Sequence, residues 1–189
     1  MSETDKKVIV LVGMPGAGKS SCVDFMESKG WPAVYFGGIT VDEVKARGQE
    51  VNEANEKVVR EELRAQGGMG VMADRIIPKI EALFDQGYTT VIADGMYSWA
   101  EYKIFKEKYG DNAVIIAITA SRKLRHERLA HRPVRPFTDE EVTSREYAEI
   151  ENIEKGGPIA NADYTLVNDG GVPVMTAALD SILKQAGAL

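Results

Sequence analysis

The chain has 189 residues, of which 44% are hydrophobic and 28% are charged, and its formal net charge is −6 at pH 7. These values are typical of one globular domain, here residues 1–189, that buries a substantial core. The acidic balance argues against a nucleic-acid-coating protein, and no apolar run approaches membrane-spanning length. The polar start and the single cysteine, Cys22, lead us to expect a cytoplasmic protein with no signal peptide, no internal disulfide and no membrane partner. The sequence leaves open whether the protein is a monomer or a homodimer.

The first feature along the chain is a buried strand followed by a phosphate-binding loop. Residues 8–12 (VIVLV) predict a parallel strand, and residues 13–20 (GMPGAGKS) match G-x-x-x-x-G-K-S. In this motif backbone N–H groups and a helix N-terminus surround the phosphates, while Lys19 contacts the β- and γ-phosphates and Ser20 holds Mg²⁺. The sequence therefore predicts that a nucleotide is bound by Gly13, Met14, Pro15, Gly16, Ala17, Gly18, Lys19, Ser20 and Ser21.

The rest of the chain alternates short apolar runs with helical patterns. Further strands are predicted over about 33–36, 89–94, 113–119 and 164–167, and helices over about 21–29, 40–47, 51–63, 71–86, 98–109, 121–131, 138–154 and 174–185. Capping-box patterns predict helix starts at Thr40, Ser98 and Thr138, while the glycine pairs 37–38 and 156–157 predict breaks and Pro78 a kink or a late start. This alternation indicates an α/β protein with a parallel sheet covered on both faces.

The third predicted strand ends in an acidic residue, Asp94. Ligands of parallel sheets bind at the carboxyl ends of the strands, where the phosphate-binding loop also lies. Asp94 could be a partner for the Mg²⁺ shell or the base that orients an acceptor group, and the alternative is a strand-end acid that binds nearby backbone amides. We favour the catalytic interpretation because of the adjacent loop.

Four arginines follow the fourth predicted strand at helical spacing: Arg122, Arg125, Arg128 and Arg132. Residues 122–135 hold six Lys or Arg and one acid. Cations beside phosphoryl oxygens stabilise the transition state of phosphoryl transfer. The alternative is a solvated basic helix that pairs with the acidic helix at 139–154. We expect both, with Arg128 and Arg132 facing the nucleotide and the other charges on the surface.

Four segments together resemble P-loop kinases of the nucleoside-monophosphate-kinase and dephospho-CoA-kinase type: residues 13–20, 93–95 (ADG), 127–132 (ERLAHR) and 162–170 (ADYTLVNDG). The chain resembles more closely a dephospho-CoA-kinase-like family of small archaeal and bacterial proteins. This resemblance implies the P-loop NTPase fold, with five parallel strands in the order 2-3-1-4-5, a helical acceptor-binding segment at about 38–68 and a lid at about 132–145. It also implies that Arg128 and Arg132 lie near the ATP phosphates and the adenine, that Asn168 to Gly170 pass beside the adenine, and that Asp94 lies near magnesium and acceptor.

One segment departs from the family pattern. Members often have an arginine shortly after the Asp-Gly pair that clamps an acceptor phosphate, but residues 96–99 here are M-Y-S-W. The predicted acceptor contacts are Thr40, Arg47, Arg60, Arg64 and Tyr97. Arg47, Arg60 or Arg64 could replace the missing arginine, and Tyr97 and Trp99 could stack on a base or ring of the acceptor, although such aromatics more often pack under a lid. The absent arginine leaves the identity of the acceptor open.

The sequence thus predicts a kinase that transfers the γ-phosphoryl group of Mg-ATP to a small acceptor of the nucleoside monophosphate or dephospho-CoA class. The predicted catalytic residues are Lys19, Asp94, Arg128 and Arg132, and the predicted magnesium partners are Ser20 and Asp94. The alternative is a regulatory nucleotide-binding ATPase or switch protein without a small-molecule acceptor. GTP is disfavoured, because Asn168-Asp169 lacks the lysine of a guanine-reading Asn-Lys-x-Asp motif.

Overall fold

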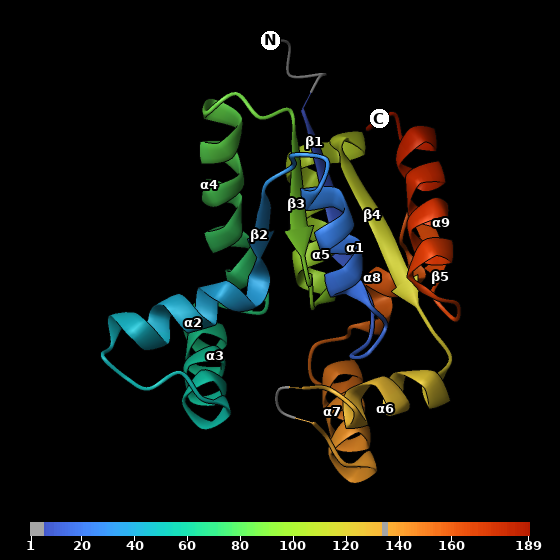
Figure 1. Cartoon of the computed structure of the whole chain (residues 1–189). Coiled ribbons are helices and arrows are strands. Elements are labelled where there is room, and N and C mark those ends of the chain that lie inside the picture. Colours follow the sequence, from blue (N-terminus) through green and yellow to red (C-terminus); the bar gives the residue numbers. More distant parts are fainter. Residues whose placement is uncertain (1–5, 134–135) are drawn as a thin grey trace.

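The computed structural model describes residues 6–133 and 136–189. Its centre is a five-stranded parallel sheet (Figure 1). The strands are β1 (Lys7–Val12), β2 (Ala33–Tyr35), β3 (Thr90–Asp94), β4 (Ala113–Thr119) and β5 (Tyr164–Val167), in the order β2-β3-β1-β4-β5. The predicted α/β class and strand order are confirmed.

Helices cover both faces of the sheet, as the sequence predicted. They are α1 (Lys19–Glu27), α2 (Phe36–Ala46), α3 (Glu53–Gly67), α4 (Val71–Asp85), α5 (Trp99–Tyr109), α6 (Arg122–Ala130), α7 (Asp139–Glu151), α8 (Gly156–Ala160) and α9 (Val172–Gln185), with a 3₁₀ turn at Gly110–Asn112. Because side chains alternate along a strand, Val8, Val10 and Val12 of β1 pack in the cluster formed by α2 to α5, whereas Ile9 and Leu11 pack with α1 and α9.

The register of the sheet brings the functional strand ends together. Leu11 of β1 pairs with Asp94 of β3 on one side and with Ile116 of β4 on the other. The carboxyl ends of the three central strands therefore lie at one edge, where the loop before α1 begins. In Figure 1, α2 and α3 lie to one side of this edge, and α6 and α7 lie to the other.

Both predicted glycine breaks are wrong, because both glycine pairs lie inside helices. Gly37 and Gly38 belong to α2, which begins at Phe36 rather than at Thr40. Phe36 is buried against the Phe105 ring, with the ring centroids 5.5 Å apart, and this packing outweighs the low helix propensity of glycine. Thr40 is consequently buried within the helix and caps nothing.

The second pair, Gly156 and Gly157, opens the short helix α8. A Cβ on Gly157 would lie 2.9 Å from Cε3 of Trp99, so close packing on α5 explains the missing side chain. Pro78 lies inside α4, where the pattern had predicted a kink or a late start; the helix begins at Val71 and continues past the proline, with its apolar face in the core.

Two of the predicted helix starts are confirmed with both hydrogen bonds of the capping box. Ser98 and Glu101 form one box at the start of α5, and Thr138 and Glu141 form the other at the start of α7. None of the helices in the described part of the chain combines the length and the hydropathy needed to cross a membrane.

Candidate functional site

The phosphate-binding loop packs so closely on its neighbours that two of its positions accept only glycine. A Cβ on Gly16 would lie 2.6 Å from the carbonyl oxygen of Arg125, and a Cβ on Gly18 would lie 2.2 Å from Nδ2 of Asn168. Both glycines also have positive φ, of +78° and +98°. The loop therefore rests directly on α6 and on the segment that follows β5.

Lys19 lies at the first position of α1 and folds back over the loop. Its Nζ donates to the carbonyl oxygens of Gly13, at 2.8 Å, and Met14, at 3.4 Å. Burial, followed by the nearby cation of Lys155, lowers the pKa of Lys19 from 10.5 to about 8. A bound phosphate would offset both effects, because it would give the ammonium group a counter-charge.

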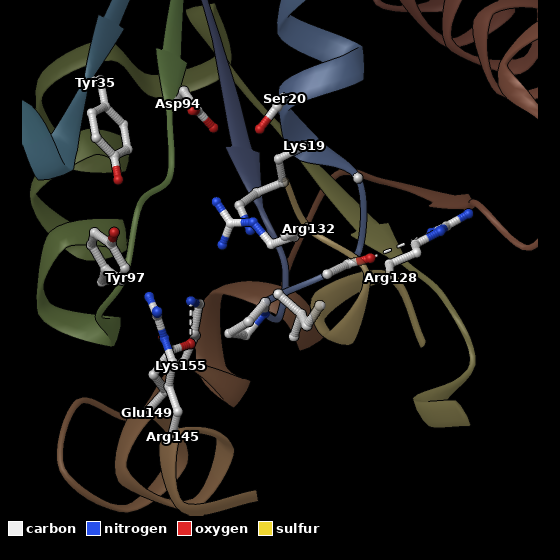
Figure 2. Close-up of a pocket in the computed structure, with 14 residues that line it drawn as sticks. Lys19, Ser20, Tyr35, Asp94, Tyr97, Arg128, Arg132, Arg145, Glu149 and Lys155 are labelled. Carbon is white, nitrogen blue, oxygen red and sulfur yellow. Dashed lines mark hydrogen bonds and ion pairs between the residues drawn. The ribbon is translucent and has the colours of Figure 1, made fainter. Parts of the chain in front are cut away.

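Ser20 and Asp94 point into the same space from different elements, Ser20 from the start of α1 and Asp94 from the end of β3 (Figure 2). Oδ1 of Asp94 is buried and has no hydrogen-bond partner among the described residues. Burial also raises the pKa of Asp94, while Lys19 and Lys155 oppose the rise. An orphaned carboxylate oxygen beside a hydroxyl is a donor set that fits Mg²⁺.

The protein on its own offers Mg²⁺ few further ligands. Within the described ranges, no three His, Cys, Asp or Glu residues group closely enough to hold a metal ion. Mg²⁺ commonly binds through one or two protein oxygens together with substrate phosphates and water. The pair of Ser20 and Asp94 therefore fits an ion that arrives with a nucleotide.

These residues line a cavity of about 280 Å³. Figure 2 shows Lys19 and Arg132 on one side of this space and Tyr35, Tyr97 and Arg145 on the other. The lining residues are Pro15, Gly16, Gly18, Lys19, Ser20, Tyr35, Asp94, Tyr97, Arg128, Leu129, Arg132, Arg145, Glu149 and Lys155. Five of them are cations and two are carboxylates, so the cavity suits an anion.

The four predicted arginines divide into two pairs. Arg122 and Arg125 form ion pairs with Glu146, which confirms that part of the basic stripe binds the acidic helix α7. Arg128 lines the cavity and donates to the carbonyl oxygens of Gly16, at 3.4 Å, and Asn168, at 2.9 Å. Arg132 lies beyond the end of α6 and lines the same cavity.

Sequence reasoning missed an ion-pair cluster in the cavity wall, formed by Arg145, Glu149 and Lys155. The Nζ of Lys155 donates to Glu149 at 2.5 Å, and Nε of Arg145 donates to the other oxygen of Glu149 at 3.0 Å. Burial alone would raise the pKa of Glu149, but the two cations outweigh it and hold this pKa below its ordinary value. The spacing of four between Arg145 and Glu149 was a readable signal, whereas nothing in the sequence marked Lys155.

A second and larger cavity, of about 860 Å³, lies between α3 and α7. It shares Tyr97, Arg145 and Glu149 with the first cavity, so the two adjoin. Its lining residues are Glu53, Lys57, Arg60, Glu61, Arg64, Met69, Tyr97, Phe137, Glu140, Glu141, Ser144, Arg145, Ala148, Glu149, Asn152 and Ile153.

Comparison with known proteins places this chain in a family. No protein-family model matches it. It is 36% identical over 187 residues to a UPF0200 protein of Hyperthermus butylicus, a match that covers 98% of this chain and 97% of the relative. A UPF0200 protein of Thermococcus kodakarensis is 35% identical over 166 residues, covering 86% of this chain and 89% of the relative. The chain belongs to the UPF0200 family.

Solved structures show the wider fold of this UPF0200 protein. TT1252 from Thermus thermophilus superposes with a TM-score of 0.67 at 17% identity and covers 95% of this chain and 97% of its own. Shikimate kinase from Bacteroides thetaiotaomicron superposes with a TM-score of 0.61 at 14% identity, and the match covers 94% of this chain and 98% of that one. A gluconokinase from Sinorhizobium meliloti superposes with a TM-score of 0.58 at 13% identity, and the match covers 96% of this chain and 94% of that one. The UPF0200 chain thus has the fold of small-molecule P-loop kinases, and the closer likeness to dephospho-CoA kinase stays a prediction.

The structure of the UPF0200 protein also separates the predicted acceptor residues. Arg60, Arg64 and Tyr97 line the second cavity, so the structure brings these three together. Arg47 lines neither cavity and instead pairs with Glu43 and Glu62 on the surface, and Thr40 is buried in α2. Arg47 and Thr40 are therefore not part of the acceptor site that we propose below.

Asn168 holds the loop of the UPF0200 protein in place. Its Nδ2 donates to the carbonyl oxygen of Ala17 at 2.8 Å, and its backbone N–H donates to Thr119 at 2.7 Å. Neither Asn168 nor Gly170 is among the residues that line the first cavity, and their place beside the adenine stays a prediction. Of the predicted lid, residues 134–135 lie outside the described residues, while Arg132 and Arg145 line the first cavity.

Proposed function

We propose that this UPF0200 protein is a phosphotransferase that moves the γ-phosphoryl group of ATP to a small acceptor. One observation carries the proposal: the cavity of the phosphate-binding loop adjoins a larger cavity, and the two share Tyr97, Arg145 and Glu149. A protein that only binds a nucleotide has no need of the second space. The kinase fold supports the same function class.

Five residues of the loop cavity have roles in the proposed reaction. Lys19 binds the transferred phosphoryl group, and Arg128 and Arg132 neutralise the charge on its oxygens. Ser20 and Asp94 would hold the Mg²⁺ that arrives with the nucleotide, and this ion would add charge neutralisation. The alternative role of Asp94 is that of the base that orients the acceptor's hydroxyl group and accepts its proton.

The test is ADP formation from Mg-ATP, with the Lys19→Ala variant as the blank. Nucleoside monophosphates, dephospho-CoA, shikimate and gluconate are added one at a time. The proposal predicts that an acceptor increases the rate of ADP formation in wild type but not in Lys19→Ala. The control variant Lys184→Ala removes a lysine whose side chain is 67% exposed, and it should respond to the acceptor as wild type does. Wild-type activity in Lys19→Ala would show that the loop is not the site of turnover.

The second candidate function is a regulatory ATPase whose output is a conformational state. The presence of Tyr97 in the segment where the resembled family often has an acceptor-clamping arginine favours it. Slow hydrolysis at one rate with every added compound supports this candidate, and acceptor-stimulated ADP release excludes it as the sole function.

A further inference from the structure

Of the cations that the described residues place around the larger cavity, one has no ion-pair partner. Four cationic side chains line it, and three of them pair with carboxylates: Lys57 with Glu61 at 4.0 Å, Arg60 with Glu53 at 3.2 Å and Arg145 with Glu149 at 3.0 Å. Among the described residues, Arg64 has no carboxylate within ion-pair distance, and its buried Nε has no hydrogen-bond partner.

This arrangement of Arg64 is costly in the absence of a ligand. Burial lowers the pKa of the Arg64 guanidinium, and the carboxylate of Glu101 only partly opposes that effect. The side chain as a whole is only partly buried, but its Nε is a donor removed from water without a hydrogen-bond partner, and such a donor destabilises a protein. Such destabilising groups are typical of binding sites, where the ligand supplies the missing hydrogen-bond partner.

The chemistry of Arg64 determines what kind of group completes it. A guanidinium carries five N–H donors in a planar fork, which matches the paired oxygens of a carboxylate or a phosphate. Five glutamates also line this cavity. Glu53 and Glu149 are bound by Arg60, Arg145 and Lys155, and Glu61 pairs with Lys57. Glu141 accepts a hydrogen bond from the backbone of Thr138, and Glu140 and Glu141 are both exposed to water, which screens their charge. Arg64 is therefore the lining cation that, within the described residues, has no ion pair, and its guanidinium is available to an anionic group in the cavity.

The remaining lining indicates the body of the ligand. Met69, Tyr97, Phe137 and Ile153 contribute apolar or aromatic surface, and the cavity has a volume of about 860 Å³. Arg145 lies over the Phe137 ring, with its guanidinium carbon 5.7 Å from the ring centroid, which fixes that ring in the wall. Space and lining thus suit an organic molecule with an apolar or ring portion.

We propose that this cavity is the acceptor site, that the acceptor is an organic anion, and that Arg64 binds its phosphate or carboxylate group. The word acceptor rests on the function proposed above, whereas the anion site at Arg64 does not. A molecule bound at Arg64 can extend past Tyr97, which borders both cavities, and present a hydroxyl group toward the cavity of Lys19.

The test is calorimetric titration with three small probes that share one ring: phenyl phosphate, benzoate and the uncharged benzamide. A non-hydrolysable Mg-ATP analogue is present at saturation, so that the probes do not occupy the phosphate-binding loop. We expect phenyl phosphate or benzoate to bind wild type at least about tenfold more tightly than benzamide does, because charged hydrogen bonds supply that margin. Which of the two binds more tightly tells whether the acceptor carries a phosphate or a carboxylate.

Substitutions of Arg64 test whether this residue binds the anionic group of the probe. In Arg64→Gln the affinity of the anionic probe should fall to that of benzamide, whereas Arg64→Lys should keep part of the gain. The matched control is Lys57→Gln, on the same helix and the same cavity, whose side chain is 64% exposed and which should stay within about twofold of wild type. The melting temperature of ligand-free Arg64→Gln should equal or exceed that of wild type, because an unsatisfied charge is removed.

The proposal is overturned if both anionic probes bind no more tightly than benzamide, or if Arg64→Gln binds them as wild type does. A fall in the melting temperature of Arg64→Gln, with Arg64→Lys binding no better, also overturns it, because Arg64 is then a structural partner of buried Glu101. Arg64-dependent binding without acceptor-stimulated ADP formation would refute the kinase function and leave the anion site standing.

Discussion

The lowered pKa of Lys19 predicts that the affinity for nucleotide depends on pH between pH 7 and pH 9. Without ligand this pKa is about 8, because the ammonium group is buried and lies near Lys155. A bound triphosphate stabilises the charged form of Lys19 and raises its pKa. Affinity is therefore nearly full at pH 7 and falls as the pH rises through about 8.

The size of the effect follows from the pKa. With a pKa of about 8, about nine-tenths of the Lys19 side chains are charged at pH 7 and about one-tenth at pH 9. The affinity for a non-hydrolysable Mg-ATP analogue should fall by about tenfold, or about 1.4 kcal/mol, between these two values. Proton uptake on binding at pH 8.5 should appear in calorimetry as a dependence of the heat on the ionisation enthalpy of the buffer.

Two variants test the cause. Lys19→Arg carries a permanent charge, so its affinity, at whatever level, should not change between pH 7 and pH 9. Burial is the main cause of the lowered pKa of Lys19 and Lys155 is the next, so Lys155→Met should move the midpoint of the pH profile to higher pH. An affinity of wild type that stays constant from pH 7 to pH 9, with no proton uptake, would refute this reasoning.

Three further substitutions test the architecture of the loop cavity. Arg128→Ala should lower turnover by about 100-fold or more while Mg-ATP analogue affinity falls by less than about tenfold, and equal losses in kinetics and binding would assign Arg128 to ground-state binding only. Gly18→Ala has φ +98° and a clash with Asn168, so it should abolish binding of the analogue and lower the free energy of unfolding in urea by about 1–3 kcal/mol. The control Gly30→Ala has φ +87° but lies in open space, so it should bind the analogue normally. Similar binding by both variants would contradict the packing described. Asn168→Ala removes the hydrogen bond to Ala17 and should cost about 1–3 kcal/mol in the same unfolding assay, and an unchanged unfolding free energy would show that this bond does not hold the loop.

The parts that could be predicted from the sequence are those set by local patterns. The phosphate-binding motif, the alternating apolar runs and the Ser98 and Thr138 caps each specify structure within a few residues. The strand order came from the family resemblance and is confirmed. The break predicted at Gly37 failed because burial of Phe36 against a helix far along the chain decides where α2 begins.

The walls of the cavities could not be predicted, because they combine distant segments. Lys155 lines the loop cavity from the position directly before α8, and no spacing rule connects it to Lys19. Arg47 and Arg64 both lie in the segment predicted to bind the acceptor, but of these two only Arg64 lines the larger cavity between α3 and α7. The spacing of four between Glu43 and Arg47 was the one local sign that Arg47 is used in a surface ion pair.

The central claim is most directly tested by following the terminal phosphate of ATP labelled with phosphorus-32. The label is traced after incubation with Mg²⁺ and each candidate organic anion, in wild type and in Lys19→Ala. Phosphoryl transfer predicts that the label moves into an organic product in wild type and stays on ATP in Lys19→Ala. Label that appears only as inorganic phosphate, at the same rate with and without every anion, would contradict the claim.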